Sequence, residues 1–393
     1  MGRLTRTVTR AGYRHVVKPL LFRRHPDAVH ADIVRLGKLV PHMLGVRSIP
    51  RSWAYHNSKY LRQTLMGVSF RNPVGLAAGF DKNIELAPLM KSIGFGFMTG
   101  GSVTAVACDG NPRPWFHRLP RSKSLVVHAG LPNVGVKRIV ETIASYPRRL
   151  CADFPLVLSV AKTNAEFTAV DDVAIDDYCA SLTQLELSSH IALYELNISC
   201  PNAYGGEPFT DAGRLDELLH RIDQLKLTRP MVVKMPISLS WVHTSALLDV
   251  IARHDVAGVT IGNLLKDRHQ AQLDDELDDD TKGSLSGLPT RDISTELIRK
   301  TYQHYGERLI IIGVGGIFSA EDAYAKIRAG ASLVELITGM IFEGPQLIGE
   351  ITHGLIELLE HDGFTHISQA VGVDSVRPTT NHSTTASARQ EAA

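Results

Sequence analysis

A polar hexapeptide, residues 197–202, offers the clearest chemistry in this sequence. It reads Asn-Ile-Ser-Cys-Pro-Asn and follows an apolar segment that is typical of a buried strand. Proline has no amide hydrogen and a fixed φ, so the chain is expected to turn at Pro201. The turn would place the Cys200 thiol at the strand end, beside the amides of Asn197 and Asn202. Amides can bind a planar polar ligand and a thiol can exchange a proton with it. Alternatively, the same residues only satisfy backbone groups at a turn.

Lysines mark two other predicted strand ends. The segment 77–83, AAGFDKN, contains small residues that would let a flat ligand approach the backbone, while Lys82 supplies a cation. Lys234 lies inside the apolar run 231–235. Burial of its charge is costly unless the charge is paired, so we expect an anion or carbonyl group of a ligand as its partner.

Glycine-rich turns follow the last two predicted strands. They read GVGGI at 313–317 and TG at 338–339. Either turn alone is a common feature of loops. Together, at the spacing of the last two strands of a barrel, they predict backbone amides that bind a phosphate group. A further pair of glycines precedes Ser102 at the end of the second predicted strand.

Eight short apolar runs, most of them separated by helical patterns, are expected to position these residues. They cover 73–78, 97–103, 156–161, 193–198, 231–235, 258–261, 309–314 and 333–337, with helical patterns at, for example, 246–253 and 320–329. This order predicts an α/β fold, a (β/α)8 TIM barrel, whose active site lies at the carboxyl ends of the strands. An open, doubly wound sheet is the alternative.

The N-terminal extension, residues 1–52, is strongly basic. It holds eleven Lys and Arg against two Asp, a net charge of 11 − 2 = +9, whereas the whole chain carries +1. Apolar residues at spacings of three and four predict a helix over 26–40. The pattern favours an element that lies on a membrane surface or binds a lipophilic partner. Alternatively, the helix packs on the main domain, or the first 25 residues are a targeting peptide.

Composition excludes several function classes. The four cysteines form no CxxC pair, which argues against a disulfide or zinc framework. No apolar run approaches the roughly 18 residues of a membrane span, and no nucleic-acid motif is present. The acidic run 274–280 is expected to be a solvated loop rather than a metal site. The barrel is expected over 53–375, and the tail 376–393, rich in Ser, Thr and Ala, is expected to be disordered.

Taken together, the motifs resemble those of the dihydroorotate dehydrogenase family. The resembling segments are GLAAGFDKN (75–83), GNPRPWFHRL (110–119), GLPNVGV (130–136), NISCPN (197–202), MVVKM (231–235), GSLSG (283–287), IIGVGGI (311–317) and AGASLVELITG (329–339). The basic segment 13–36 is similar to the helical extension of the membrane-associated, quinone-linked class. In that class the extension binds the membrane surface and guides quinone to the flavin.

The resemblance implies an FMN enzyme that oxidises (S)-dihydroorotate to orotate in pyrimidine synthesis, with Cys200 as the base, Lys82 as a second catalytic residue and quinone as the acceptor. Implied FMN contacts are Ala78, Gly79, Lys82, Ser102, Asn197, Lys234, Gly287, Gly316, Thr338 and Gly339. Implied substrate contacts are Lys82, Asn197, Asn202 and Asn263. The implied location is peripheral to a membrane, on the cytoplasmic side, or at the mitochondrial inner membrane if residues 1–25 are a targeting peptide. No metal site is implied.

Several positions depart from the family pattern. Cysteine as the base and the segment GLPN at 130–133 are similar to the soluble class, whereas the quinone-linked class has serine as the base. Other departures are Val127 in place of a substrate-binding asparagine, Leu264 in place of a hydroxyl residue, Gly262 in place of a threonine and Ser159 in place of an asparagine. Loss of a buried amide partner would cost about 1–3 kcal/mol. Two alternatives therefore remain open, an FMN barrel enzyme with a less polar cyclic substrate and a flavin-binding protein without turnover.

Overall fold

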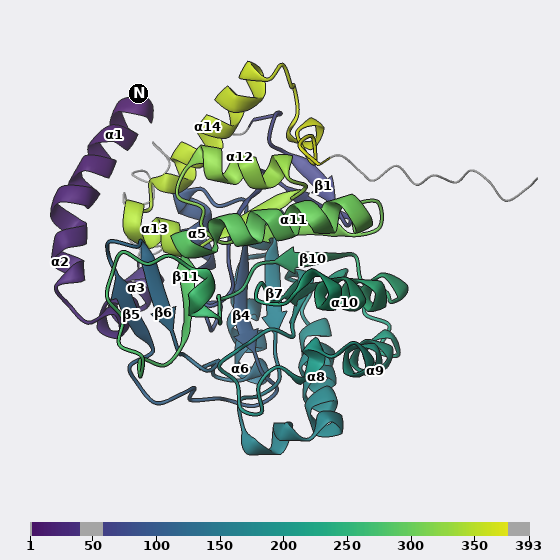
Figure 1. Cartoon of the computed structure of the whole chain (residues 1–393). Helices are drawn as coiled ribbons and strands as arrows, with labels where there is room; N and C mark the ends of the chain where they lie inside the picture. The colour runs from purple at the N-terminus through teal and green to yellow at the C-terminus, as the bar shows by residue number, and fades with distance from the viewer. Residues whose placement is uncertain (1, 40–57, 376–393) are drawn as a thin grey trace, which may run out of the picture.

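Eight parallel strands close into a barrel (Figure 1). The computed structural model describes residues 2–39 and 58–375. The barrel strands are β3 (Val74–Leu76), β4 (Phe97–Val103), β7 (Leu156–Val160), β8 (Ile191–Asn197), β9 (Met231–Met235), β10 (Gly258–Ile261), β12 (Ile310–Val314) and β13 (Leu333–Leu336), and β13 pairs with β3. The predicted barrel is confirmed and the doubly wound alternative is wrong. Each strand is buried on both faces, which explains why the strands are continuous apolar runs in the sequence.

Helices cover the outside of the barrel. They are α5 (Ala87–Ile93), α6 (Val136–Ala144), α7 (Arg148–Asp153), α8 (Asp171–Glu186), α9 (Ala212–Asp223), α10 (Trp241–Arg253), α11 (Arg291–Tyr305), α12 (Ala320–Arg328), α13 (Thr338–Glu343) and α14 (Leu347–His361). Both of the predicted helices named above are present. The first of them, α10, begins five residues earlier than predicted because Ser240 caps it by accepting from the His243 amide.

Two small antiparallel sheets complete the main body. The hairpin of β1 (Gln63–Leu65) and β2 (Val68–Phe70) ends in Phe70, which packs inside the barrel with Phe97. A second sheet, in the order β11-β6-β5, contains β5 (Phe116–Leu119), β6 (Ser124–Val127) and β11 (Ser284–Gly287). This second sheet forms within the segments 104–134 and 263–292. It extends the wall of the barrel mouth on one side.

The N-terminal helices lie beside that second sheet (Figure 1). They are α1 (Gly2–Gly12), the π-helix η1 (Tyr13–Val17), α2 (Lys18–Phe22) and α3 (Pro26–Leu39). Buried Asp27 fastens α3 by accepting from the Trp115 and Phe116 amides at 3.0 and 3.1 Å, and the Tyr13 hydroxyl donates to the Ile341 carbonyl at 2.6 Å. The predicted helix at 26–40 is thus present through residue 39. Residues 40–52 and the predicted disordered tail 376–393 lie outside the described residues.

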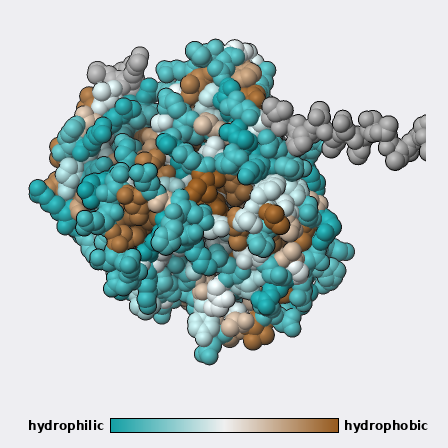
Figure 2. All heavy atoms as spheres, in the orientation of Figure 1, coloured by the Kyte–Doolittle hydropathy of each residue, from teal (hydrophilic) through white to brown (hydrophobic). Residues whose placement is uncertain are grey.

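No helix among the described residues combines the length and apolar character that crossing a bilayer requires. The N-terminal helices nevertheless expose apolar side chains. Six of the fifteen large apolar side chains that are exposed among the described residues lie within 2–39, namely Val8, Val16, Val17, Leu20, Leu36 and Leu39. Figure 2 shows apolar patches among the hydrophilic surface on the side of the molecule where these helices lie.

Candidate active site

Two adjoining pockets open at the carboxyl ends of the barrel strands, and together they contain every residue for which the sequence predicted a site role. The larger pocket is lined by Ala78, Gly79, Lys82, Ser102, Asn197, Cys200, Asn202, Lys234, Asn263 and Thr338. The smaller pocket is lined by Gly287, Gly316 and Gly339, and it shares Ala78, Lys234, Asn263 and Thr338 with the larger one. The barrel thus gathers into one place residues that are up to 261 positions apart in the sequence, from Ala78 to Gly339.

A chain of buried polar side chains connects three strands at the bottom of the larger pocket. The Asn197 amide donates to the Ser102 hydroxyl at 2.9 Å, and the Ser102 and Ser159 hydroxyls are also 2.9 Å apart. The side-chain Oδ1 of Asn197 accepts from the backbone amide and hydroxyl of Ser199. Because these bonds fix the rotamer of Asn197, its amide is held rigidly at the pocket wall. Ser159, one of the departures from the family pattern, is therefore satisfied by a hydroxyl partner.

Cys200 follows β8 and faces the larger pocket. Burial raises the pKa of its thiol to about 11, and the nearby charges of Lys234 and Lys162 act in the opposite direction. Lys162 also fixes the loop after Cys200, because its ammonium group donates to the Tyr204 and Thr168 carbonyls. The thiol is thus held in place and stays protonated at neutral pH.

An amide cluster supports the opposite wall of this pocket. The Asn202 side chain donates to the Val127 carbonyl at 3.0 Å and lies 3.3 Å from His128 Nδ1. The Asn111 side chain donates to the Asn202 carbonyl at 3.0 Å, and Asn164 donates to Asn111 Oδ1 at 3.1 Å. Asn111, Asn164 and His128 were not among the residues predicted for the site. Asn111 lies in the motif GNPRPWFHRL, but the sequence does not show that it contacts Asn202.

The backbone explains the glycine at one of the departures, Gly262, and two others, Val127 and Leu264, make the pocket wall apolar. At Gly262, φ is +133°, and a Cβ there would lie 2.4 Å from the Val314 carbonyl oxygen, so the backbone path excludes a side chain. Both polar atoms of the Asn263 side chain bind the protein, because Nδ2 donates to the carbonyl and hydroxyl of Ser199 and Oδ1 accepts from Leu264. Asn263 therefore connects the loop after β10 to the loop after β8. The side chains of Val127 and Leu264 line the pocket as apolar groups.

The two lysines of the larger pocket have different surroundings. Lys82 donates to the Gly79 carbonyl at 2.9 Å and lies 5.3 Å from the centre of the Phe116 ring. Burial lowers its pKa to about 8. Lys234 lies 3.7 Å from Glu195, which is buried on the neighbouring strand. The expectation that a ligand would supply the partner of Lys234 therefore missed a carboxylate of the protein itself.

The smaller pocket has the features of an anion site. Gly315 and Gly316 both have positive φ, and a Cβ on Gly316 would lie 2.3 Å from Cβ of Arg291. This loop thus packs directly against the first residue of α11, where only glycine fits. A Cβ on Gly339 would lie 1.9 Å from the Ile317 carbonyl oxygen. Such close contacts leave backbone amides free of side-chain cover, as a phosphate site needs.

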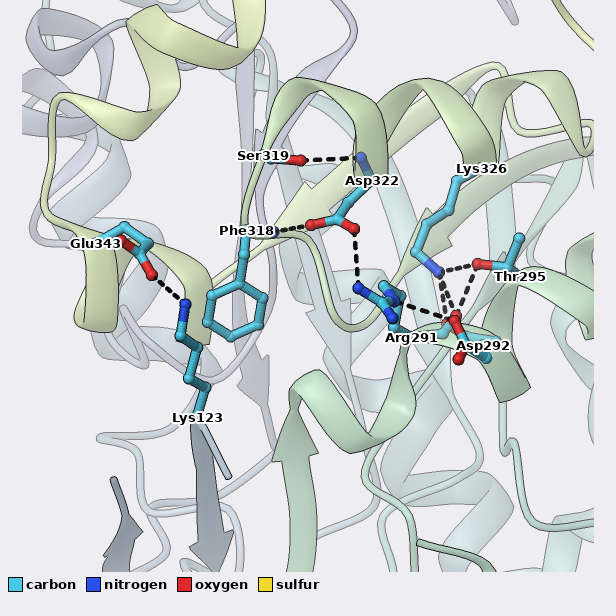
Figure 3. Close-up of polar contacts among 10 residues, drawn as sticks. Lys123, Arg291, Asp292, Thr295, Phe318, Ser319, Asp322, Lys326 and Glu343 are labelled. Atoms are coloured by element: carbon cyan, nitrogen blue, oxygen red, sulfur yellow. Dashed lines mark hydrogen bonds and ion pairs between the residues drawn. The ribbon is translucent and has the colours of Figure 1, made fainter. Parts of the chain in front are cut away.

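Two positive side chains near the glycine loop, Lys123 before β6 and Arg291 at the start of α11, are paired with acids (Figure 3). Lys123 pairs with Glu343 at 2.8 Å, and Arg291 pairs with Asp322 at 3.4 Å and Asp292 at 3.0 Å. Behind them the fully buried ammonium group of Lys326 donates to the Arg291 carbonyl and to two hydroxyls, Ser294 and Thr295. Burial lowers the pKa of Lys326 to about 7. These bonds fix the first turn of α11 against the glycine loop.

The larger pocket continues to the N-terminal helices. Pro26, Val29, His30 and Ile33 of α3 line it together with Leu125, Ile337 and Ile341 of the main body. His30 lies 2.8 Å from the Phe80 carbonyl oxygen, and burial lowers its pKa to about 4, so it is neutral at physiological pH. A charged lining residue among these side chains is Arg118, which donates to the Arg24 carbonyl. A mostly apolar passage therefore extends from the barrel mouth to α3.

The comparison with protein families decides the identity of this architecture. The family profile described as "Dihydroorotate dehydrogenase" matches residues 60–359, which include all eight strands of the barrel. The chain belongs to the dihydroorotate dehydrogenase family. The resemblance predicted from the motifs is confirmed, and the protein is an oxidoreductase.

Curated members of the dihydroorotate dehydrogenase family match almost the full chain. A "Dihydroorotate dehydrogenase (quinone)" of Nostoc punctiforme is 34% identical over 380 residues, covering 92% of this chain and 98% of that protein. One of Gloeobacter violaceus is 36% identical over 359 residues, covering 91% and 98%. The match thus extends beyond the family profile into the N-terminal extension.

Solved structures of the family have the same fold. The ligand-free crystal structure of DHODH from Eimeria tenella superposes with a TM-score of 0.77 at 24% identity, covering 89% of this chain and 99% of that one. The complex of the Eimeria tenella enzyme with ferulenol gives a TM-score of 0.74 at 23% identity. At this identity the likeness concerns the fold, including helices that precede the barrel.

Proposed function

We propose that this protein is an FMN-dependent dihydroorotate dehydrogenase that oxidises (S)-dihydroorotate to orotate in pyrimidine synthesis and passes the electrons to a quinone. Family membership and the activity for which the curated relatives are named support the reaction. One observation carries the proposal further than family alone. A single pocket reaches from the Cys200 thiol at the barrel mouth to the apolar face of α3.

The two pockets fit FMN. Gly79 offers a bare backbone, since a Cβ on it would meet no heavy atom within 4 Å, and this leaves room for a flat ring at the mouth. Asn197, Ser102 and Lys234 would bind the polar edge of that ring, and the glycine loop with Thr338 would bind the phosphate. When bound, FMN supplies the acceptor for the hydride that leaves the substrate.

The residues beside this place fit the pyrimidine substrate. Cys200 would remove the proton from C5 of dihydroorotate as a general base. Lys82 would stabilise negative charge on the substrate carbonyl or carboxylate groups, and the amides of Asn197 and Asn202 would orient the ring. The Asn202 side chain donates to the Val127 carbonyl, and its Oδ1 lies 3.3 Å from His128 Nδ1. These contacts set its orientation before the substrate binds.

The passage along α3 supports quinone as the acceptor. Its mostly apolar walls, with a neutral His30, suit a lipophilic molecule. The exposed apolar residues of the N-terminal helices, in a segment with a net charge of +9 over residues 1–52, suit the surface of an anionic membrane. We therefore propose a peripheral membrane location, where a quinone dissolved in the bilayer reaches the passage.

Val127 favours a second candidate function, oxidation of a less polar cyclic substrate by the same machinery. Its side chain lines the pocket beside Leu131 and Leu264, which makes this wall more apolar than an amide would. The substitution Val127→Asn distinguishes the candidates. If dihydroorotate is the substrate, the added amide should lower its KM by up to about tenfold, the effect of one hydrogen bond. An unchanged or higher KM would favour the less polar substrate.

An anaerobic titration tests the main proposal. Purified protein should bind FMN and be yellow, and dihydroorotate should bleach the flavin in the absence of oxygen. A quinone added to the reduced protein should restore the colour. A flavin that stays oxidised in excess dihydroorotate would contradict the proposed reaction, and a protein that stays colourless with excess FMN would contradict the cofactor.

A further inference from the structure

A layer of polar side chains crosses the interior of the barrel below the candidate active site. It is formed by Thr99 of β4, Ser159 of β7, Glu195 of β8, Lys234 of β9, Thr260 of β10 and Glu335 of β13, and each is at most 4% exposed. Five of them lie two residues after members of the apolar cluster that contains Phe97, Val157, Leu193, Val232 and Leu333. Residues two apart in a strand point to the same side, so all of these side chains share the barrel interior.

This polar layer contains two acids and one base. Lys234 Nζ lies 3.7 Å from Glu195 Oε1, and the Thr99 hydroxyl donates to Glu335 Oε1. The other side chains of this layer are the hydroxyls of Thr99, Ser159 and Thr260. Gly75 of β3 pairs with Glu335, and Ile312 of β12 belongs to the apolar cluster. The titratable groups that face one another here are therefore Glu195, Lys234 and Glu335. With both acids ionised, the layer would hold one uncompensated negative charge.

The unpaired carboxylate oxygens indicate that one of the two acids is protonated. Within the described part of the chain, Glu335 Oε2 and both carboxylate oxygens of Glu195 are buried without a hydrogen-bond partner. An unpaired, ionised carboxylate in such a place costs far more than a neutral one. Burial, followed by the charge of Glu195, raises the pKa of Glu335 to about 8. One proton held between the two acids removes the excess charge and leaves Glu195 and Lys234 as an ion pair.

We propose that Glu195 and Glu335 hold one proton between them and that this pair sets the reduction potential of the bound flavin through Lys234. The inference rests on the proposed function, because Lys234 lines both pockets where FMN would lie. Within the layer, Lys234 would direct its positive charge toward the cofactor. Glu195, on the side away from the cofactor, would partly cancel that charge. Glu195 and Glu335 are thus positioning residues, which act on the cofactor through the lysine.

The physical consequence is a link between the charge of the layer and flavin reduction. A reduced flavin carries additional negative charge, so each uncompensated carboxylate below Lys234 disfavours reduction. Loss of the shared proton at high pH would therefore lower the potential further. Substituting one acid by glutamine lets the other ionise and keeps the charge of the layer. Substituting both Glu195 and Glu335 by glutamine would leave Lys234 without a facing carboxylate and favour reduction.

The midpoint potential of the FMN-loaded protein provides the first test. The double variant Glu195→Gln/Glu335→Gln should raise the ratio of reduced to oxidised flavin about tenfold at a fixed solution potential, which is about 30 mV for a two-electron couple. Glu335→Gln imitates the protonated acid, so its potential should match the wild type at pH 7. Above pH 8 its potential should fall less steeply than that of the wild type. Glu186→Gln, which breaks an ion pair with Arg229 outside the barrel, is the matched control and should change neither value.

Infrared spectroscopy provides a second test that does not depend on FMN. The carbonyl stretch of a protonated, buried carboxylic acid should be present in the wild type and in Glu186→Gln at pH 7, and absent in Glu335→Gln. Thr99→Val removes the hydroxyl that binds Glu335 and should shift loss of that band to higher pH. This variant serves if Glu335→Gln does not fold.

The outcomes separate the inference from the proposed function. A protein that binds no FMN contradicts the function, and the infrared band alone then decides whether the proton is shared. If no protonated-acid band differs between the wild type and Glu335→Gln, the shared proton is overturned. If FMN binds and the double variant Glu195→Gln/Glu335→Gln has the potential of the wild type, the effect on the flavin is overturned.

Discussion

The Cys200 thiol lines the larger pocket, just after the end of β8. The motif already placed a thiol at a strand end. The structure adds a reason why this thiol is protonated at rest, since burial raises its pKa to about 11. As a general base it must be deprotonated to act, so its active fraction grows with pH up to that value.

We expect Cys200→Ala to slow flavin reduction by dihydroorotate by roughly 10²–10⁴-fold, the usual contribution of a general base. In the wild type, the reduction rate should rise with pH and show no plateau at the ordinary thiol pKa of about 8.5. Anaerobic stopped-flow measurement of flavin bleaching gives both quantities. FMN binding should be unchanged in the variant. Equal reduction rates in the two proteins would exclude Cys200 as the base.

At this scale the sequence predicted the position of every candidate site residue in the mouth of the barrel, but not all of their partners. The amide cluster of Asn111, Asn164 and Asn202 depends on loops after different strands, and no local pattern shows that they meet. The strand period alone indicates that Glu195 points to the same side of the strand as Asn197, two positions away. That it faces Lys234 and Glu335 follows only from the closure of the barrel.

The barrel strands were predictable as elements because each is buried on both faces and therefore continuously apolar. The sheet β11-β6-β5 was missed for the opposite reason. Its strands are four residues long, β5 is only partly buried, and β11 pairs with β6 across 157 positions, from Val127 to Ser284. Strands this short, with a distant partner, have no distinguishing period. These strands form the wall that lies beside α3.

The helix α3 gives a prediction that separates the two halves of the reaction. Ile33 of α3 lines the passage, so Ile33→Trp should fill the passage with an aromatic ring. We expect quinone-dependent turnover to fall at least tenfold, while the rate of flavin reduction by dihydroorotate stays within twofold of the wild type. Steady-state quinone assays and anaerobic stopped-flow measurements report the two values.

The matched control is Leu36→Trp on the same helix, where the side chain is exposed and does not line the passage. It should leave quinone turnover unchanged. If Ile33→Trp also leaves turnover unchanged, quinone does not reach the flavin along α3, and the proposed role of this helix is wrong.

For the molecule as a whole, the distribution of charge and apolar surface distinguishes one end from the rest. Residues 1–52 carry +9 while the remainder carries about −8, so the chain is strongly polarised although its net charge is only +1. The sequence predicted both the charge and the α3 helix of this end. It could not predict how the helices dock, because their fastening contacts, such as Asp27 with β5 and Tyr13 with Ile341, join residues about 90 and 328 positions apart.

This polarity predicts how the intact protein binds a membrane. It should co-sediment with vesicles that contain anionic phospholipid and bind neutral vesicles more weakly, and higher salt should weaken the binding because the Debye length shortens. Glu substitutions at Val16 and Leu20, both more than half exposed on the N-terminal helices, should reduce binding at least tenfold. Val242→Glu, on an exposed site of α10, should not. Equal binding by both variants would show that this end of the molecule does not contact the bilayer, and the quinone would then have to reach α3 from solution.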